Sequence, residues 1–140
     1  MDKEDELRFN IRKKESEMDM YQSQVKHLEI KLDKLYYAKE KQIGVLNNFL
    51  ETQYKRKQKY KEVLAISGNI KFMKSHSTRV LDILHGARAN QTEMMLEASR
   101  TGIDVEITQT QEEIERLRAM NRLLDSEMQQ LYFDLRKLSM

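Results

Sequence analysis

The chain contains no cysteine, no proline and no tryptophan, and only four of its 140 residues are glycine. Without cysteine it has neither a disulfide framework nor a thiolate metal site. Proline ends helices because its ring fixes φ and removes the N–H donor, so a chain without it has few obligatory helix ends. Aromatic residues are also scarce, at 7%. These absences argue against a globular domain with a large core.

Long apolar segments are missing as well. No run of roughly 18 apolar residues is present to span a membrane. The first six residues are mostly charged, whereas a secretory signal would carry an apolar stretch. With the lack of cysteine, these features predict a cytoplasmic protein, with the nucleus as the alternative.

The residues that dominate the chain are good helix formers. Lysine, glutamate, leucine, arginine, glutamine and methionine are abundant, and charged residues make up 34% of the sequence. This composition is typical of long helices and coiled coils. The predicted fold class is therefore all-α, built from long coiled-coil helices.

Residues 7–63 carry a heptad pattern, in which apolar residues recur at alternating steps of four and three. Polar residues interrupt the pattern at 39–42 and 53–56. Between these interruptions the apolar stripe widens to include Tyr36, Ile43 and Leu50, which share a flanking heptad position. A stripe of this width buries more than one neighbouring helix can cover, so it suggests a third or fourth helix.

The heptad pattern from Ile103 to Leu138 is cleaner, because only Thr110 and Asn121 interrupt its apolar positions. A core asparagine can fix the register and the partner of a coiled coil. Asn121 is also compatible with a tolerated polar layer. Thr101 and the carboxylate of Asp104 resemble a helix-starting capping box, but they could equally lie inside one continuous helix.

We expect one coiled-coil domain over residues 1–140, with a helical arm at 3–65, a weak basic middle at 66–100 and a second arm at 101–138. The best turn signal is at 67–69 (Ser-Gly-Asn), and His85-Gly86 is a second candidate.

Two architectures fit these segments. In the first, the chain turns near 67–69 into an antiparallel helical hairpin that oligomerises. Asn121 then falls opposite Lys14, and Lys39 opposite Glu97. In the second, a continuous or broken long helix forms a parallel coiled-coil dimer. Asn121 then faces its own copy, and flanking residues such as Glu113 and Arg118 attract each other between chains.

The heptad seams and the widened stripe together make up the predicted oligomer and partner interface. Its residues are Leu28, Leu32, Leu35, Tyr36, Ile43, Leu46, Phe49, Leu50, Ile107, Ile114, Leu117, Asn121, Leu124, Met128, Leu131 and Leu135. We expect protein partners at this surface, including further copies of the chain in a dimer or a larger homo-oligomer.

The region 55–88 is strongly basic, since Glu62 and Asp82 are its only acidic residues. Clustered lysine and arginine attract phosphates and acidic surfaces. The predicted contact patch consists of Lys55, Arg56, Lys57, Lys59, Lys61, Lys71, Lys74 and Arg79. An acidic protein surface or a nucleic acid is the expected partner of this patch.

No motif in the sequence indicates catalysis. The chain has no Gly-rich phosphate loop, no Gly-x-Ser-x-Gly elbow and no His-Glu-x-x-His. Its histidines, at 27, 76 and 85, do not have ligand spacing. We therefore expect no catalytic residue, no cofactor, no metal and no small-molecule substrate.

The leading functional hypothesis is a structural or adaptor coiled coil that self-associates and docks protein partners within a larger assembly. A nucleic-acid-binding protein using residues 55–88 is one alternative. A secretion stalk or an escort-type helical hairpin is the other, and it rests on analogy at the level of fold alone.

Overall fold

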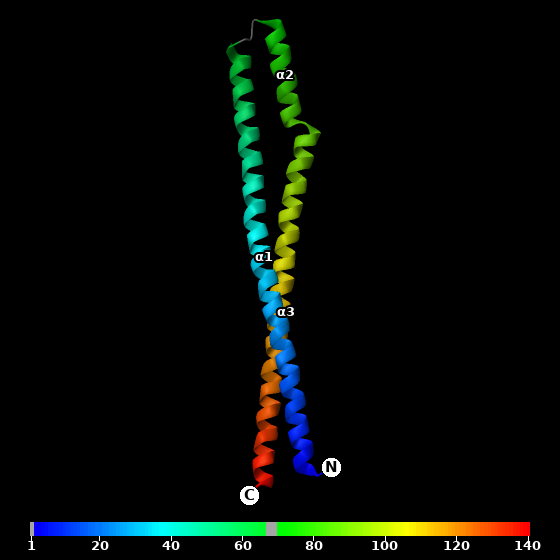
Figure 1. Ribbon diagram of the computed structural model, residues 1–140. Coiled ribbons are helices and arrows are strands. Elements are labelled where there is room, and N and C mark those ends of the chain that lie inside the picture. The colour runs from blue at the N-terminus through cyan, green and yellow to red at the C-terminus, as the bar shows by residue number, and fades with distance from the viewer. Residues whose placement is uncertain (1, 67–69) are drawn as a thin grey trace. The chain divides into compact units, whose positions relative to one another are not determined.

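The computed structural model describes residues 2–66 and 70–140, and these residues form three α-helices and no strand. Figure 1 shows α1 (Lys3–Ile66), α2 (Lys71–His85) and α3 (Ala87–Leu138). The chain is therefore all-α, as its composition predicts. The predicted turn at 67–69 lies outside the described residues.

The chain divides into two packed units. Unit 1 consists of Met1–Leu35 together with Glu106–Met140, and unit 2 consists of Tyr36–Val105. In unit 1 the first half of α1 packs against the second half of α3. In unit 2 the second half of α1 packs against α2 and the first part of α3 (Figure 1).

Ion pairs between the helices of unit 1 show the direction of packing. Lys14 Nζ lies 2.6 Å from Glu127 Oε2. Further along α1, Lys31 Nζ lies 3.4 Å from Glu106 Oε2. Residue numbers that rise along α1 therefore meet numbers that fall along α3, so the two helices are antiparallel.

Unit 2 has the same direction. Lys39 Nζ lies 2.7 Å from Asp104 Oδ1. Further along α1, the rings of Tyr60 and His76 meet edge to face with their centroids 6.2 Å apart. Both units are thus antiparallel helix pairs, which confirms the helical hairpin rather than the parallel alternative.

Side chains at the outer helix ends satisfy backbone groups and complement the helix dipole. Asp2 Oδ1 accepts a 2.8 Å hydrogen bond from the backbone N–H of Asp5, so Asp2 caps α1. Glu4, Asp5 and Glu6 place negative charge in the first turn of α1. Arg136 and Lys137 place positive charge in the last turn of α3, where it is favourable.

Gly86 separates α2 from α3. Its backbone is extended, with φ −76° and ψ 178°, and its N–H donates to the carbonyl of Ile83. Its own carbonyl accepts a hydrogen bond from the N–H of Asn90, in the first turn of α3. A Cβ atom at this position would lie 2.9 Å from the carbonyl oxygen of Asp82. The second turn signal in the sequence therefore marks a break between helices, and the close approach of the backbone explains the glycine.

The region around Thr101, by contrast, is continuous helix. Thr101 lies inside α3, and its Oγ1 donates to the carbonyl of Glu97 at 3.0 Å. Of the two readings of the Thr101–Asp104 segment, the uninterrupted helix is therefore the one that holds.

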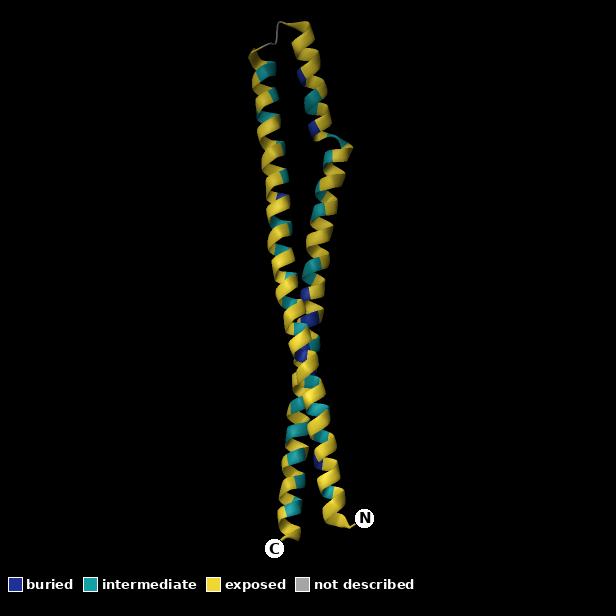
Figure 2. Cartoon of the chain, in the orientation of Figure 1, coloured by how far each residue is buried: buried dark blue, intermediate teal, exposed yellow. Residues whose placement is uncertain are grey.

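The core of unit 1 is a narrow seam between α1 and α3. Val25 packs with Ile114 and Leu117, and Tyr21 with Leu28 and Leu32 cover this cluster. In Figure 2 the buried and half-buried residues of unit 1 lie mostly on the facing sides of its helices. The remaining buried residues of the seam are Ile11, Ile107 and Thr110.

The core of unit 2 is thinner. Leu46 of α1 and Leu84 of α2 are its buried apolar residues, and Ser77 of α2 is buried with them. Gln42 Nε2 donates to the carbonyl of Leu96 at 3.2 Å, so a side-chain amide occupies one layer of the seam. The polar positions that interrupt the heptads in 39–42 thus remain inside the seam as bonded layers.

The predicted heptads match the buried faces, but the predicted opposite pairs are wrong. Asn121 contacts the backbone of Met18 instead of lying opposite Lys14. Lys39 pairs with Asp104 instead of Glu97. The predicted pairs were counted at one helical rise per residue from a turn at 67–69, whereas the extended backbone at Gly86 interrupts the returning arm. Long lysine side chains also reach beyond the adjacent helical turn.

We predict that Leu117→Ala destabilises the protein by about 2–5 kcal/mol, because it removes a core side chain and leaves a cavity. Leu117 is only 1% exposed. Chemical unfolding followed by circular dichroism measures the change. The control is Leu123→Ala on the same helix, where the side chain is 61% exposed and the expected change is within about 0.5 kcal/mol. Equal effects of the two variants would contradict the described seam.

Candidate interaction surface

Most residues of the predicted interface are used inside the hairpin itself. The following lie buried or half-buried between α1 and the returning helices: Leu28, Leu32, Leu35, Leu46, Phe49, Ile107, Ile114, Leu117, Asn121, Leu124, Met128, Leu131 and Leu135. They hold the two arms together. The apolar residues of the predicted interface that lie beside the seam are Tyr36, Ile43 and Leu50.

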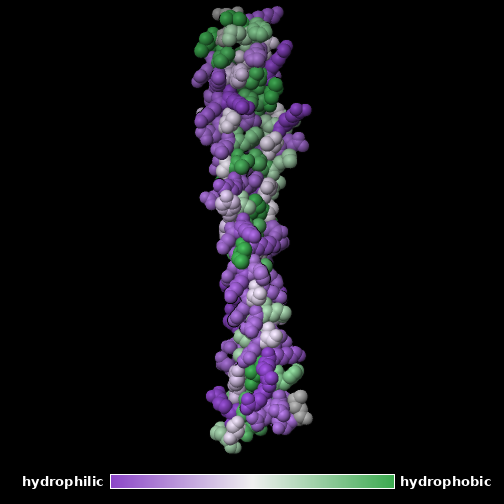
Figure 3. All heavy atoms as spheres, viewed as in Figure 1, coloured by the Kyte–Doolittle hydropathy of each residue, from purple (hydrophilic) through white to green (hydrophobic). Residues whose placement is uncertain are grey.

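These three residues begin a longer row on α1 within unit 2. Stepping by four and three from Tyr36 gives Tyr36, Glu40, Ile43, Asn47, Leu50, Tyr54 and Lys57, which we name the flanking stripe. Residues at this spacing share one face of a helix. The structure leaves Leu50 37% exposed and Tyr54 64% exposed. On the visible face in Figure 3, hydrophobic side chains gather in patches between hydrophilic ones.

The flanking stripe borders a hollow between the helices of unit 2. This hollow has a volume of about 140 Å³. Leu50, Tyr54 and Lys57 line it from α1, and Leu84 lines it from α2. A side chain from another helix placed on the stripe would therefore meet both apolar surface and a recess.

Sequence reasoning found only the first part of this stripe. It identified Tyr36, Ile43 and Leu50 by their common heptad position, placed Lys57 in the basic patch, and did not name Glu40, Asn47 or Tyr54. Continuing the same stepping on the flanking face would have found them, because the spacing is visible in the sequence. Whether these side chains are exposed depends on which residues the returning arm covers. That cannot be predicted from the sequence alone.

Asn121 makes an intrachain contact in unit 1. Its Nδ2 donates to the backbone carbonyl of Met18 at 3.3 Å, and its Oδ1 is buried without a hydrogen-bond partner in the described part of the chain. In the antiparallel hairpin this residue contacts α1 rather than a second copy of itself. It occupies a polar layer of the seam.

The flanking charges of the α3 seam also pair within the chain. Glu113 bonds Arg116 on the same helix, and Arg118 bonds Glu29 of α1 at 2.7 Å. The parallel-dimer hypothesis predicts instead that Glu113 and Arg118 attract each other between chains. The bond to Arg116 lowers the pKa of Glu113, as a positive neighbour favours the charged carboxylate.

The predicted basic patch lies on the end of α1 and the start of α2 in unit 2. Lys55 pairs with Glu51 one turn away at 2.8 Å, which lowers the pKa of Glu51 and raises that of Lys55. Lys57 is half-buried beside the hollow. The exposed members of the patch, besides Lys55, are Arg56, Lys59, Lys61, Lys71, Lys74 and Arg79.

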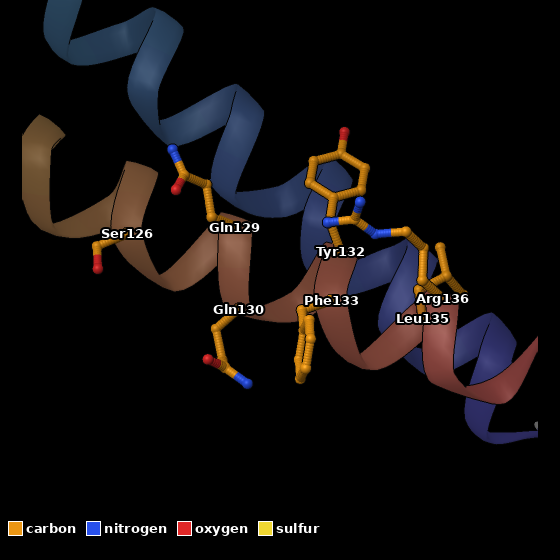
Figure 4. A pocket seen from close by; sticks show the side chains of 7 residues that line it. All are labelled: Ser126, Gln129, Gln130, Tyr132, Phe133, Leu135 and Arg136. Atoms are coloured by element: carbon orange, nitrogen blue, oxygen red, sulfur yellow. The ribbon is translucent and has the colours of Figure 1, made fainter.

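A second hollow lies on the C-terminal part of α3 in unit 1, and Figure 4 shows its lining residues. It is open, with a volume of about 880 Å³. The Tyr132 hydroxyl at its edge donates to Glu15 Oε1 at 2.9 Å, and this bond raises the pKa of Tyr132. The lining residues are Ser126, Gln129, Gln130, Tyr132, Phe133, Leu135 and Arg136. The lining residues themselves include no carboxylate and no imidazole.

Within residues 2–66 and 70–140, no group of three or more histidine, cysteine, aspartate or glutamate side chains could hold a metal ion. None of the helices in this part of the chain is both long and apolar enough to cross a membrane.

Comparison with known proteins finds no matching family model, no matching curated protein and no matching solved structure. The surfaces described above are therefore the basis for inferring a function.

We predict that Asn121→Leu raises the free energy of unfolding by about 1 kcal/mol, because it removes a buried oxygen that lacks a partner. Thermal unfolding followed by circular dichroism measures the change. The control is Asn10→Leu on the exposed face of α1, with an expected change within about 0.5 kcal/mol. A loss of stability, or a change in the mass of the particle, would show that Asn121 specifies register or partner instead.

Proposed function

We propose that the protein is a structural adaptor that self-associates through the flanking stripe and docks protein partners on its helical faces. The observation that carries this proposal is the set of apolar residues of the flanking stripe, which the returning arm covers only in part. Leu50 and Tyr54 remain exposed, and Ile43 is half-buried. A helix laid along the flanking stripe would bury apolar surface. Each Å² removed from water stabilises the complex by about 25 cal/mol.

The order of residues along the stripe supports a second copy of the chain as the partner. Glu40 carries negative charge near one end, Ile43 and Leu50 lie in the middle, and Lys57 carries positive charge at the other end. When two such stripes pack antiparallel, each acidic end meets a basic end. A parallel arrangement would place like charges together, which is unfavourable.

One antiparallel register satisfies both the charges and the apolar residues. In this register Glu40 of each copy lies beside Lys57 of the other. Ile43 then meets Tyr54, and Asn47 meets Leu50. The interface is isologous, since the same patch of both copies contacts itself across a two-fold axis. Two hairpins would thus form a four-helix arrangement, in which each stripe gains the additional helix that its width predicts.

Glu40 and Lys57 do not pair within one copy. They lie seventeen residues apart on one continuous helix, which places them roughly 25 Å from each other. Any energetic coupling between these two side chains must therefore pass between copies. This separation makes the pair a suitable probe of the proposed register.

We predict that the double variant Ile43→Asp/Leu50→Asp is monomeric where the parent chain is a dimer. Burying two carboxylates in the interface should raise the dissociation constant at least about a hundredfold. Size-exclusion chromatography with light scattering gives the mass, and circular dichroism checks that the helices remain.

The control for this variant is Val45→Asp. Val45 is 53% exposed on the other side of the seam of the same unit, so its change should leave the mass unaltered. A parent chain that is monomeric at all accessible concentrations would refute self-association. Dissociation by Val45→Asp alone would place the interface on the other face.

We further predict that Glu40→Lys and Lys57→Glu each weaken the dimer about threefold to tenfold, because each creates two like-charge contacts across the two-fold axis. The double variant Glu40→Lys/Lys57→Glu should restore the parental affinity. Sedimentation equilibrium at low salt measures the three constants. Additive losses in the double variant would contradict the antiparallel register but leave self-association standing.

A further inference from the structure

The end of unit 2 where α1 finishes and α2 begins carries exposed apolar side chains. Ile66 is 87% exposed and Phe72 is 80% exposed. Ile70 and Met73 are exposed with them. We name these four residues the apolar end. None of them belongs to the flanking stripe, so the proposed self-association does not use them.

Ring contacts bring the two helix ends together. His76 of α2 meets Tyr60 of α1 edge to face, and it stacks on Phe72 with the centroids 6.4 Å apart and the rings nearly parallel. Ile66 lies less than two turns beyond Tyr60 on α1. The end of α1 and the start of α2, which carry the apolar end, are therefore neighbours.

Lysine side chains surround the apolar end. Lys59 and Lys61 precede it on α1, and Lys71 and Lys74 lie among its residues on α2. All four are exposed. Glu62 is the only acidic residue between Lys55 and Arg79 in the sequence. The surface thus combines aliphatic and aromatic groups with a concentrated positive charge.

We propose that the apolar end and its lysines bind the surface of an anionic lipid bilayer. Moving exposed isoleucine and phenylalanine side chains out of water is favourable. The boundary between the headgroups and the acyl chains of a bilayer can take up such side chains. Lysine stems can lie along the acyl boundary while their ammonium groups stay among the headgroups. Phosphate and carboxylate groups of acidic lipids supply the complementary charge.

The side-chain chemistry favours a lipid surface over a nucleic acid. Single-stranded nucleic acids bind aromatic faces on which bases stack, together with a basic groove. Among the four residues of the apolar end, only Phe72 has an aromatic ring. Ile66 and Ile70 have no flat face to offer to a base. Binding of a nucleic acid would leave these aliphatic side chains in water, whereas a bilayer would cover them.

The chain has no tryptophan, so a single introduced tryptophan reports on one position without background. The probe is Phe72→Trp, and the ligand is a vesicle of phosphatidylcholine mixed with phosphatidylserine. We expect a blue-shifted emission on adding these vesicles, and quenching when the lipids carry bromine on their acyl chains. Vesicles of phosphatidylcholine alone should give little shift.

The matched control is Ile83→Trp. Ile83 belongs to the same helix and is 71% exposed, but it lies away from the apolar end. Its tryptophan should show no bromine quenching. Equal quenching at both positions, or an equal shift with neutral vesicles, would overturn the proposal, as would the absence of any shift at position 72.

Charge reversal tests the lysines. Each lysine near an anionic surface strengthens binding about fivefold, so Lys71→Glu/Lys74→Glu should weaken vesicle binding at least about twenty-fivefold. The control Lys13→Glu/Lys34→Glu makes the same change in net charge on exposed residues of unit 1 and should have little effect.

Preferential binding of a nucleic acid or of an acidic protein would contradict the proposed lipid ligand. The proposal would be overturned if a random oligonucleotide or polyglutamate bound more tightly than the vesicles. In that case Lys71→Glu/Lys74→Glu would weaken this binding, and Phe72→Ser would leave its affinity unchanged. The dimer is measured separately in the absence of lipid. Failure of vesicle binding with an intact dimer would therefore refute only this inference.

Discussion

Two helices packed side by side can bury only one narrow stripe of each, and this constraint governs the whole protein. In unit 1 the buried stripe is the cluster of Val25, Ile114 and Leu117 with the residues that cover it. In unit 2 even fewer apolar residues are buried. Most of each helix surface therefore remains outside the seam, and both proposed surfaces lie there.

The two proposed surfaces of unit 2 use the exposed residues in different ways. The flanking stripe has apolar residues in its middle and one charge of each sign towards its two ends, which suits another helix because helices present side chains at the same spacing. The apolar end has no such arrangement. Its apolar residues are grouped, and its charge is of one sign, which suits an extended surface more than a single helix. The distribution of charge therefore separates the two surfaces even though both lie within one unit.

The sequence predicted the seams well because a heptad repeat is a local property of one helix. Leu117 and Ile114 could be placed in a core from spacing alone, and Gly86 could be named as a break. The pairs of residues that face each other could not be placed. Asn121 meets Met18 instead of Lys14, because register depends on the geometry of the whole returning arm, including its break.

Exposure was the second property that the sequence did not give. Tyr54 and Phe72 are ordinary aromatic residues in the sequence, and only the arrangement of the arms shows that the partner helix does not cover them. The same holds for Glu40 and Lys57, whose relation is visible only once the flanking face is known to be open. Local periodicity thus identifies what a helix can bury, whereas packing decides what it actually buries.

The break at Gly86 also determines how stability is distributed along the returning arm. A helix as short as α2 is only marginally stable in water by itself. The free-energy cost of nucleating it exceeds the stabilisation that a few helical turns provide. No side-chain hydrogen bond caps its start. The extended residue at Gly86 interrupts the helical hydrogen bonds that would otherwise tie it to α3. Its helical state therefore depends on packing against α1, and local opening is expected to begin in α2 rather than in the longer helices.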